Sequence, residues 1–230
     1  DIRAAPATDD SADFALTADT VLDAYDGERV VYLTSPHNPT GDRFTLDAVE
    51  RVGDETAEDT LVVVDEAYSE FTDAPSAVSL LDERDDVAVL RTFSKAYGLA
   101  GIRLGYAVTP SAWADAYARV QTPFAASAVA CRAGLAALED DDHVDQTVDT
   151  VAWSRQYVHD ELDARTYESH GNFVLAEVGD ATAVAEAAKR EGVLIRDCSS
   201  FGLPGHVRVT CGTREETERA VDVLNEVLAE

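Results

Sequence analysis

Three short apolar runs constrain the fold of this 230-residue chain more than any other feature: VVYL (30–33), LVVV (61–64) and VAVL (87–90). Each run is continuous and rich in β-branched residues. That pattern is typical of strands that are covered on both faces, as in parallel sheets. The alternation of such strands with crossover segments predicts a doubly wound α/β layout.

The segment between the first two runs has helical spacing, with an apolar stripe at Leu46, Val49 and Val52. Thr213 and Glu216 have the spacing of a capping box. The remaining expected elements are strands at 106–109, 173–178, 193–195 and 207–211, and helices at 111–120, 124–138, 143–163, 181–191 and 213–229. We therefore expect a large domain over 1–140 and a smaller α+β domain over 141–230.

The charge of the chain excludes several classes of partner. Forty-five acidic residues against 18 basic ones give a net charge of −27, which repels nucleic acid and anionic membranes. Lysine occurs only at positions 95 and 189. An acid-rich, lysine-poor surface is typical of proteins from a salt-loaded cytoplasm, although a merely acidic mesophilic protein is the alternative.

Other sequence features exclude further classes of function. No apolar run reaches membrane-spanning length and no signal peptide opens the sequence, so we expect a cytoplasmic protein. Cys131, Cys198 and Cys211 form no CxxC pair, which indicates neither a disulfide framework nor a zinc site. The motifs GxGxxG and GxxxxGK[ST] are absent, which disfavours nicotinamide enzymes and nucleoside triphosphatases.

A polar cluster follows each apolar run: SPHNPTG (35–41), DEAYSEF (65–71) and RTFSKAYG (91–98). In parallel α/β sheets, ligands bind at the carboxyl ends of the strands. We therefore expect the three clusters to converge at one edge of the sheet.

Three polar residues of the first two clusters have a functional and a structural interpretation. Asp65 would pair with a protonated ring nitrogen of a cofactor, or cap the next helix. Asn38 could close an Asx turn or aim its amide at a phenolic oxygen, and Tyr68 could share that oxygen or be a core tyrosine.

The third cluster offers a nucleophile and a phosphate site. Lys95 lies among small residues in a chain that otherwise uses arginine, and a deprotonated lysine amine condenses with aldehydes. Thr92, Ser94 and Arg103 supply hydroxyls and a guanidinium that suit a phosphate. The alternative is a helix that starts with Ser94 as its cap and a lysine that faces solvent.

An acid, an amide, a phenol, a lysine and a phosphate cup together fit pyridoxal 5'-phosphate. The motifs NPTG, DEAY and TFSKAYGLAGIRLGY resemble those of fold-type I aminotransferases. From about residue 20 to the end, the chain is similar to the histidinol-phosphate aminotransferase family. The resemblance implies an α/β fold, with the mainly parallel sheet of an incomplete large domain followed by a smaller C-terminal α+β domain.

The resemblance also implies roles for individual residues. Lys95 matches the lysine that forms the Schiff base, and Asp65 the partner of the pyridine nitrogen. The other matches are Asn38 and Tyr68 for the phenolic oxygen, Thr92, Ser94 and Arg103 for the phosphate, and Arg208 for the anionic group of the substrate. Arg196 is a second candidate for that anion, or a partner of Asp197.

The family implies amino transfer between histidinol phosphate and 2-oxoglutarate in histidine biosynthesis, by a homodimer. A threonine-phosphate decarboxylase, an aromatic aminotransferase and a non-catalytic fragment are the alternatives. Family members carry more than a hundred residues before the point that matches residue 1. We therefore expect that this chain lacks an N-terminal segment and is either a fragment or a naturally shortened relative.

Overall fold

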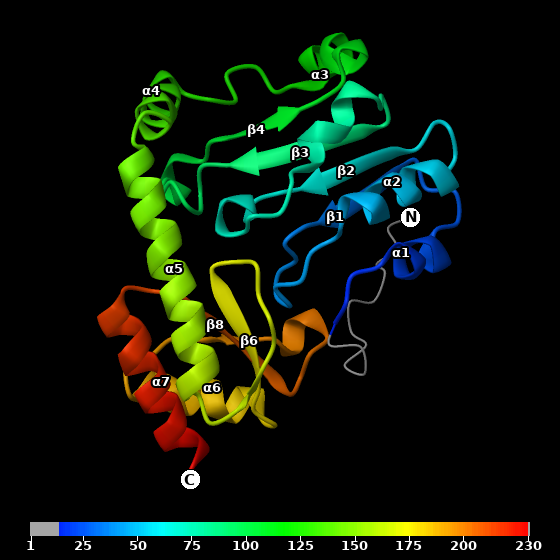
Figure 1. The fold of residues 1–230 in the computed structure, drawn as a ribbon. Helices are drawn as coiled ribbons and strands as arrows, with labels where there is room; N and C mark the ends of the chain where they lie inside the picture. The colour runs from blue at the N-terminus through cyan, green and yellow to red at the C-terminus, as the bar shows by residue number, and fades with distance from the viewer. Residues whose placement is uncertain (1–13, 230) are drawn as a thin grey trace. The chain divides into compact units, whose positions relative to one another are not determined.

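The computed structural model describes residues 14–229, which form two compact units. The first unit comprises Leu16–Pro36 and Arg43–Val144; the second comprises residues 14–15, His37–Asp42 and 145–229. Figure 1 labels their helices and strands. Within the described residues, no helix has the length and apolarity that crossing a membrane requires.

The first unit is an α/β layer structure, with η marking short 3-10 helices. Its elements are α1 (Ala18–Ala24), β1 (Val30–Thr34), α2 (Leu46–Glu55), β2 (Leu61–Asp65), η2 (Ser69–Phe71), η3 (Ala77–Asp82), β3 (Val87–Thr92), η4 (Ala100–Ile102), β4 (Gly105–Val108), η5 (Ser111–Trp113), α3 (Ala114–Val120) and α4 (Ala128–Ala137).

The sheet of this unit has the order β1-β2-β3-β4. The strands β1, β2 and β3 run parallel, and β4 returns antiparallel to β3. The predicted α/β fold with a mainly parallel sheet is therefore confirmed. The helix α2 covers one face because its predicted stripe places Val49 and Val52 in the core, beside Val62, Val64 and Val87. Burial of each such side chain contributes about 1.5–3 kcal/mol.

The prediction that all three strands are covered on both faces is wrong for β1. Its burial alternates, and Val30 and Tyr32 are 53% and 54% exposed. Val31 and Leu33 pack into the core with α1 and α2, and β1 is an edge strand whose opposite face is open among the described residues. By contrast, β2 is buried along its length up to Asp65.

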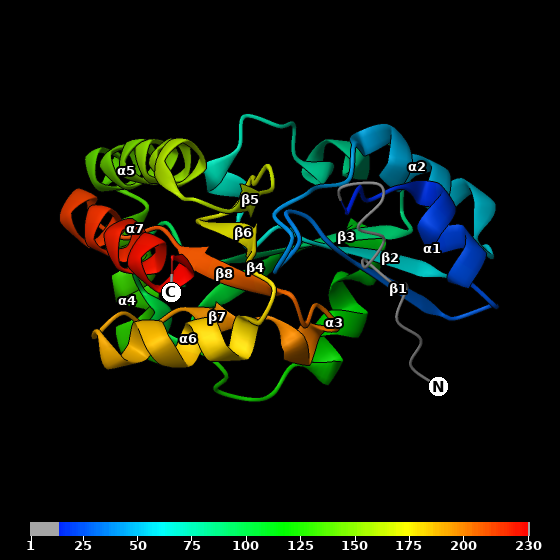
Figure 2. The same cartoon turned by 90° about the horizontal axis from the view of Figure 1, so that it is seen from below.

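The second unit is built on a separate antiparallel sheet of order β5-β6-β8-β7 (Figure 2). Its elements are α5 (Asp141–Glu161), whose first turn belongs to the first unit, β5 (Arg165–Thr166), β6 (Phe173–Glu177), α6 (Ala181–Arg190), β7 (Arg196–Asp197), η6 (Ser199–Phe201), β8 (His206–Thr210) and α7 (Arg214–Leu228).

One face of this sheet is covered by helices. Val174 of β6 and Val207 of β8 share a cluster with Val158 of α5, Val184 of α6 and Leu224 of α7. Because side chains alternate along a strand, Phe173, Leu175 and Arg208 lie on the other face. On this second face, Leu175 packs in a further buried cluster with Tyr167, Cys198 and Leu203, while Arg208 is partly exposed.

The predicted strand at 193–195 is wrong, and the observed strand β7 begins at Arg196. Gly192 has φ +82°, and the amide of Val193 donates to the carbonyl of Ala188 at 3.0 Å, which closes the end of α6. The amide of Val193 therefore bonds to the end of α6 and not to a strand, and Leu194 is 81% exposed. The helix expected at 124–138 begins only at Ala128, and the one at 111–120 opens with the 3-10 turn η5.

The capping box at the start of α7 is confirmed. The hydroxyl of Thr213 accepts from the amide of Glu216 at 3.3 Å, and the Glu216 carboxylate accepts from the amide of Thr213 at 2.8 Å. Both bonds satisfy amides that the first turn of a helix leaves without partners. The bonds that the Glu216 carboxylate accepts from the amide and the hydroxyl of Thr213 lower the pKa of Glu216.

We predict that Thr213→Ala lowers the free energy of unfolding of the second unit by about 1 kcal/mol, because one helix amide loses its acceptor. The matched control is Thr150→Ala within α5, where the hydroxyl only donates to the carbonyl of Gln146, with an expected change under about 0.5 kcal/mol. Urea unfolding in a Trp113→Phe background measures both through Trp153. Equal losses in the two variants would contradict the prediction.

Candidate functional site

The parallel register of the first unit aligns two of the predicted polar clusters. Thr34 of β1 pairs with Asp65 of β2, and Asp65 pairs with Leu90 of β3. The chain leaves β2 at Asp65 and leaves β3 at Thr92. The carboxyl ends of neighbouring strands therefore bring Asp65 and the segment that contains Lys95 to the same edge of the sheet, as expected for two of the three clusters. Of the first cluster, His37 and the residues after it belong to the second unit.

Asp65 is held at both of its carboxylate oxygens. Its Oδ2 accepts from the hydroxyl of Tyr32 at 2.5 Å, and its Oδ1 accepts from the amide of Ala67 at 3.0 Å. The bond to Ala67 has the form of a local turn, and no α-helix follows directly, so Asp65 does not cap one. Tyr32 was not a predicted site residue, because VVYL reads as a plain apolar strand.

Lys95 lies in a bend after β3 and not at a helix start. Its carbonyl accepts from the amide of Gly98 at 2.9 Å, and the φ of +69° at Gly98 is one that glycine adopts readily. The Lys95 Nζ is 4.9 Å from the centre of the Tyr68 ring, and Tyr68 is buried. A cation near an aromatic face is attracted by the ring quadrupole.

The Lys95 ammonium makes no ion pair with any acidic residue in the part of the chain that the structure describes. In a chain of net charge −27, a lysine without an acidic partner is notable, since the other lysine, Lys189, pairs with Glu186 at 3.3 Å. The contact with Tyr68 brings two of the predicted site residues together. It leaves the amine available to a reactant.

The side chains that were predicted to bind a phosphate lie on the same segment as Lys95. The hydroxyl of Thr92 accepts from the amide of Ser94 at 3.1 Å. Arg103 is exposed, has φ +57°, and donates to the carbonyl of Ala100 at 2.9 Å. A left-handed conformation in a residue other than glycine costs about 1–3 kcal/mol and is often found at functional sites.

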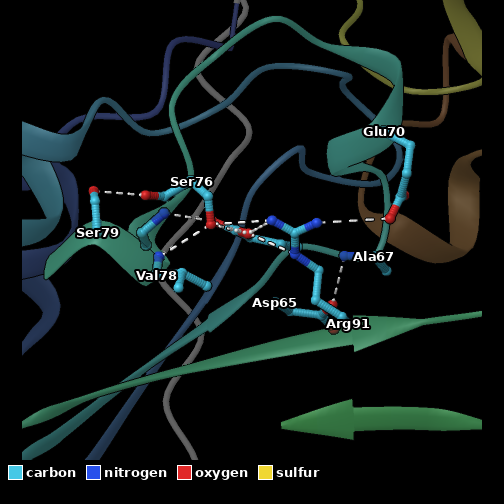
Figure 3. A network of polar contacts seen from close by, with 9 residues as sticks. Asp65, Ala67, Glu70, Ser76, Val78, Ser79 and Arg91 are labelled. Carbon is cyan, nitrogen blue, oxygen red and sulfur yellow. Dashed lines mark hydrogen bonds and ion pairs between the residues drawn. The ribbon is translucent and has the colours of Figure 1, made fainter. Parts of the chain in front are cut away.

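Arg91, the residue before Thr92, forms a largely buried ion pair with Glu66, and Figure 3 shows the polar network around Arg91. Arg91 Nε donates to Glu66 Oε2 at 2.8 Å, and Arg91 Nη2 lies 2.7 Å from the same oxygen. Glu66 also accepts from the hydroxyl of Ser76 at 2.8 Å and from the amide of Ala77 at 2.7 Å. The network joins the ends of β2 and β3 to the start of η3.

The sequence analysis missed this ion pair although its signal was present. Glu66 follows Asp65 and Arg91 precedes Thr92, and one further step of the register from Asp65 and Leu90 places Glu66 beside Arg91. The side chains of Asp65 and Glu66 must then point to opposite faces. Arg91 also lies 3.7 Å from Glu70, whose pKa is raised chiefly by burial.

A cavity of about 20 Å³ lies on the Glu66 side of the sheet and is not the candidate site. It is lined by Val64, Glu66, Ser69 and Ser76 among others, and neither Asp65 nor Lys95 lines it. That volume holds about one water molecule. The predicted site residues Asp65 and Lys95 therefore lie outside this cavity.

We predict that Arg91→Met lowers the free energy of unfolding of the first unit by about 3–5 kcal/mol, because Glu66 would stay buried without its cation. Arg29→Met is the control, since the Arg29 side chain is 82% exposed and 3.8 Å from Asp59, and exposed pairs contribute about 0–1 kcal/mol. Urea unfolding in a Trp153→Phe background reports on Trp113. A loss no greater than that of the control would refute the role of the pair.

The second unit contains the remaining predicted site residues. Arg208 of β8 donates a short hydrogen bond from Nη1 to Oδ1 of Asn38, which belongs to this unit. Its guanidinium carbon is 5.1 Å from the centre of the Phe173 ring, and its buried Nε has no hydrogen-bond partner among the described residues. Arg208 is thus a partly buried residue and not an exposed arginine on the strand surface.

Arg196 pairs directly with Arg208 across β7 and β8. Like charges opposite each other on neighbouring strands destabilise a sheet, unless an anion lies between or near them. Arg196 is exposed and donates to the hydroxyl of Ser200 at 3.1 Å. The carboxylate of Asp197 instead accepts from Thr182 and Ser199, which lowers its pKa, and no ion pair joins it to Arg196 in the described part of the chain.

Comparisons with known proteins agree with this geometry. A family model described as "Aminotransferase class I and II" matches residues 4–224. A histidinol-phosphate aminotransferase from Halobacterium salinarum is 75% identical over 222 residues, which cover 93% of this chain and 61% of that protein. One from Haloarcula marismortui is 72% identical over 218 residues, covering 95% of this chain and 61% of the relative.

A solved structure is also similar. Histidinol-phosphate aminotransferase from Sinorhizobium meliloti, in complex with pyridoxal-5'-phosphate, superimposes with a TM-score of 0.80 at 31% identity. The match covers 87% of this chain and 57% of that chain. This chain thus spans about 61% of the length of the curated relatives. The halophilic archaeal sources of those relatives agree with the salt-adapted composition that the sequence predicts.

Proposed function

We propose, because this chain belongs to the class I and II aminotransferase family, that it acts as a pyridoxal-phosphate-dependent aminotransferase. The proposed reaction transfers the amino group of histidinol phosphate to 2-oxoglutarate, in histidine biosynthesis. The observation that carries the proposal is the Lys95 amine, which has no acidic partner among the described residues and lies beside Tyr68 at the end of the sheet. The names of relatives at 72–75% identity support the choice of substrate.

The donor set in the first unit fits the cofactor chemically. An amine suits the aldehyde, a carboxylate at a strand end suits the ring nitrogen, and hydroxyls with an arginine suit the phosphate. These are Lys95, Asp65, and the group of Thr92, Ser94 and Arg103. When bound, pyridoxal phosphate supplies a ring that accepts electrons from the substrate carbon.

The residues of this chain would then hold and move protons. Asp65 would keep a proton on the ring nitrogen, since a carboxylate favours the charged form of a neighbouring base. Lys95 Nζ would hold the aldehyde of the cofactor and would move a proton to and from the substrate carbon. Tyr68 would donate a hydrogen bond to the phenolic oxygen.

The arginines of the second unit would bind the anionic groups of the substrates. Arg208 presents a guanidinium whose Nε is buried without a partner in the described part, and such a group favours a carboxylate bound in a fork. Arg196 adds a second positive charge next to it. We propose that Arg208 binds the carboxylate of the amino-acid partner and that Arg196 assists.

We also propose that the protein works as a homodimer in the cytoplasm. The support for a dimer is apolar surface in the first unit that is open among the described residues, with Val120 79% and Phe124 99% exposed. Monomeric proteins rarely leave such surface uncovered.

Lys95→Ala should abolish covalent attachment of pyridoxal phosphate, because the only other lysine is remote in sequence and paired with Glu186. The experiment mixes the chain with the cofactor, reduces with borohydride, and locates the adduct by peptide mass spectrometry. Lys189→Ala is the matched control and should retain the full adduct. An adduct that survives in Lys95→Ala would refute the assignment, and its complete absence from the unmodified chain would favour the non-catalytic alternative.

Arg208→Gln should weaken use of 2-oxoglutarate by about 10–100-fold in KM, with a smaller change in kcat, because a charge-assisted contact contributes about 1.5–3 kcal/mol. The measurement is glutamate formation from 2-oxoglutarate with histidinol phosphate as the amino donor, and carbon dioxide release is followed in parallel. Arg214→Gln, which removes an arginine that stacks on Trp153, is the control. An unchanged KM would contradict the role of Arg208, and carbon dioxide without glutamate would favour the decarboxylase.

A further inference from the structure

Tyr32 is the only side chain in the described residues for which the structure gives a hydrogen bond to the carboxylate of Asp65. It lies on β1 opposite Val63, and therefore on the same face of the sheet as Asp65, two residues further along β2. From there the phenol reaches across to Oδ2 at 2.5 Å. No motif of the sequence assigns Tyr32 a role.

The contact fixes the orientation of the carboxylate. With the hydroxyl of Tyr32 on Oδ2 and the amide of Ala67 on Oδ1, rotation about the bond to the carboxyl carbon breaks both hydrogen bonds. Each carboxylate oxygen still has acceptor capacity for one further donor. A third group can therefore bind to an acid whose plane is already set.

The phenol is the donor in this contact. Burial, and then the hydrogen bond and charge of Asp65, raise the pKa of Tyr32 well above its ordinary value. The hydroxyl thus keeps its proton throughout the pH range in which enzymes work. The residue is nevertheless 54% exposed, so its ring contributes little to the core.

We propose that Tyr32 is a positioning residue, whose hydroxyl holds the Asp65 carboxylate in the orientation that receives the ring nitrogen of the cofactor. The inference rests on the proposed function above. It extends the candidate site from the ends of β2 and β3 to the edge strand β1. It also gives a reason for a polar aromatic residue on the open face of an otherwise apolar strand.

Tyr32→Phe tests the proposal, because it removes one oxygen from a half-exposed side chain. Tyr106→Phe is the matched control: Tyr106 is 44% exposed on β4 of the same sheet, and its hydroxyl makes no hydrogen bond with another described residue. Two probes are bound to each variant. One is pyridoxal phosphate, and the other is its analogue in which a carbon atom replaces the ring nitrogen.

The loss of one positioning hydrogen bond should weaken pyridoxal phosphate binding to Tyr32→Phe by about tenfold, as followed by the borohydride-stable adduct at Lys95. Binding of the carbon analogue should stay within about twofold of the unmodified chain, because it offers Asp65 no nitrogen, and Tyr106→Phe should change neither probe. Equal weakening of both probes in Tyr32→Phe would show a merely structural role. No weakening of either would equally overturn the proposal.

A second measurement needs no cofactor. In protein labelled with ¹³C-tyrosine, the signal that disappears in Tyr32→Phe is that of Tyr32, and its titration gives the pKa. Asp65→Asn should shift that pKa downward by about one unit, because an amide no longer attracts the phenolic proton as a carboxylate does. An unchanged titration overturns the contact itself. Failure of pyridoxal phosphate to attach to Lys95 in the unmodified chain overturns the proposed function and the cofactor part of this inference, whatever the titration shows.

Discussion

The register between β2 and β3 is the constraint on which the rest of the first unit depends. It places Asp65 level with Leu90, and so brings Glu66 beside Arg91 on one face while Asp65 stays on the other. A slip of one residue would exchange these faces, burying the Asp65 carboxylate and exposing the Glu66–Arg91 pair. The buried ion pair, with Ser76 and Ala77 attached to it, therefore resists the slip that would dismantle the candidate site.

In this acidic chain, only positive charges in direct contact with an anion can contribute much to binding it. A net charge of −27 repels the anions that the proposed reaction uses, yet at molar salt the Debye length is only about 3 Å. Direct contacts then decide binding and the distant field contributes little. The Arg196–Arg208 pair concentrates positive charge on one face of the second sheet, and Lys95 is kept apart from acidic partners in the described residues. An acidic surface for solubility and a cationic site for anions can thus coexist.

Secondary structure was predictable wherever a segment carried its own signal. The runs at 30–33, 61–64 and 87–90 became strands because β-branched residues pack well in a pleated sheet, and α7 begins at the predicted capping box. The motifs also predicted that Asp65, Tyr68 and Lys95 lie near one another, because the carboxyl ends of parallel strands meet at one edge of a sheet. Prediction failed at 193–195, where the spacing of apolar residues cannot tell a strand from a helix cap that is closed by Gly192.

By itself, then, the sequence determined the α/β class, the order of the first four strands along the chain, and which residue types could bind an aldehyde, a ring nitrogen and a phosphate. Only the tertiary structure decided which faces of β1 are covered, that Tyr32 donates to Asp65, that Glu66 pairs with Arg91, and that Asn38 contacts Arg208, 170 residues away. Local patterns report on neighbours within a helical turn or a strand. Contacts between distant segments depend on how strands pair and on which side chains that pairing brings to the same level.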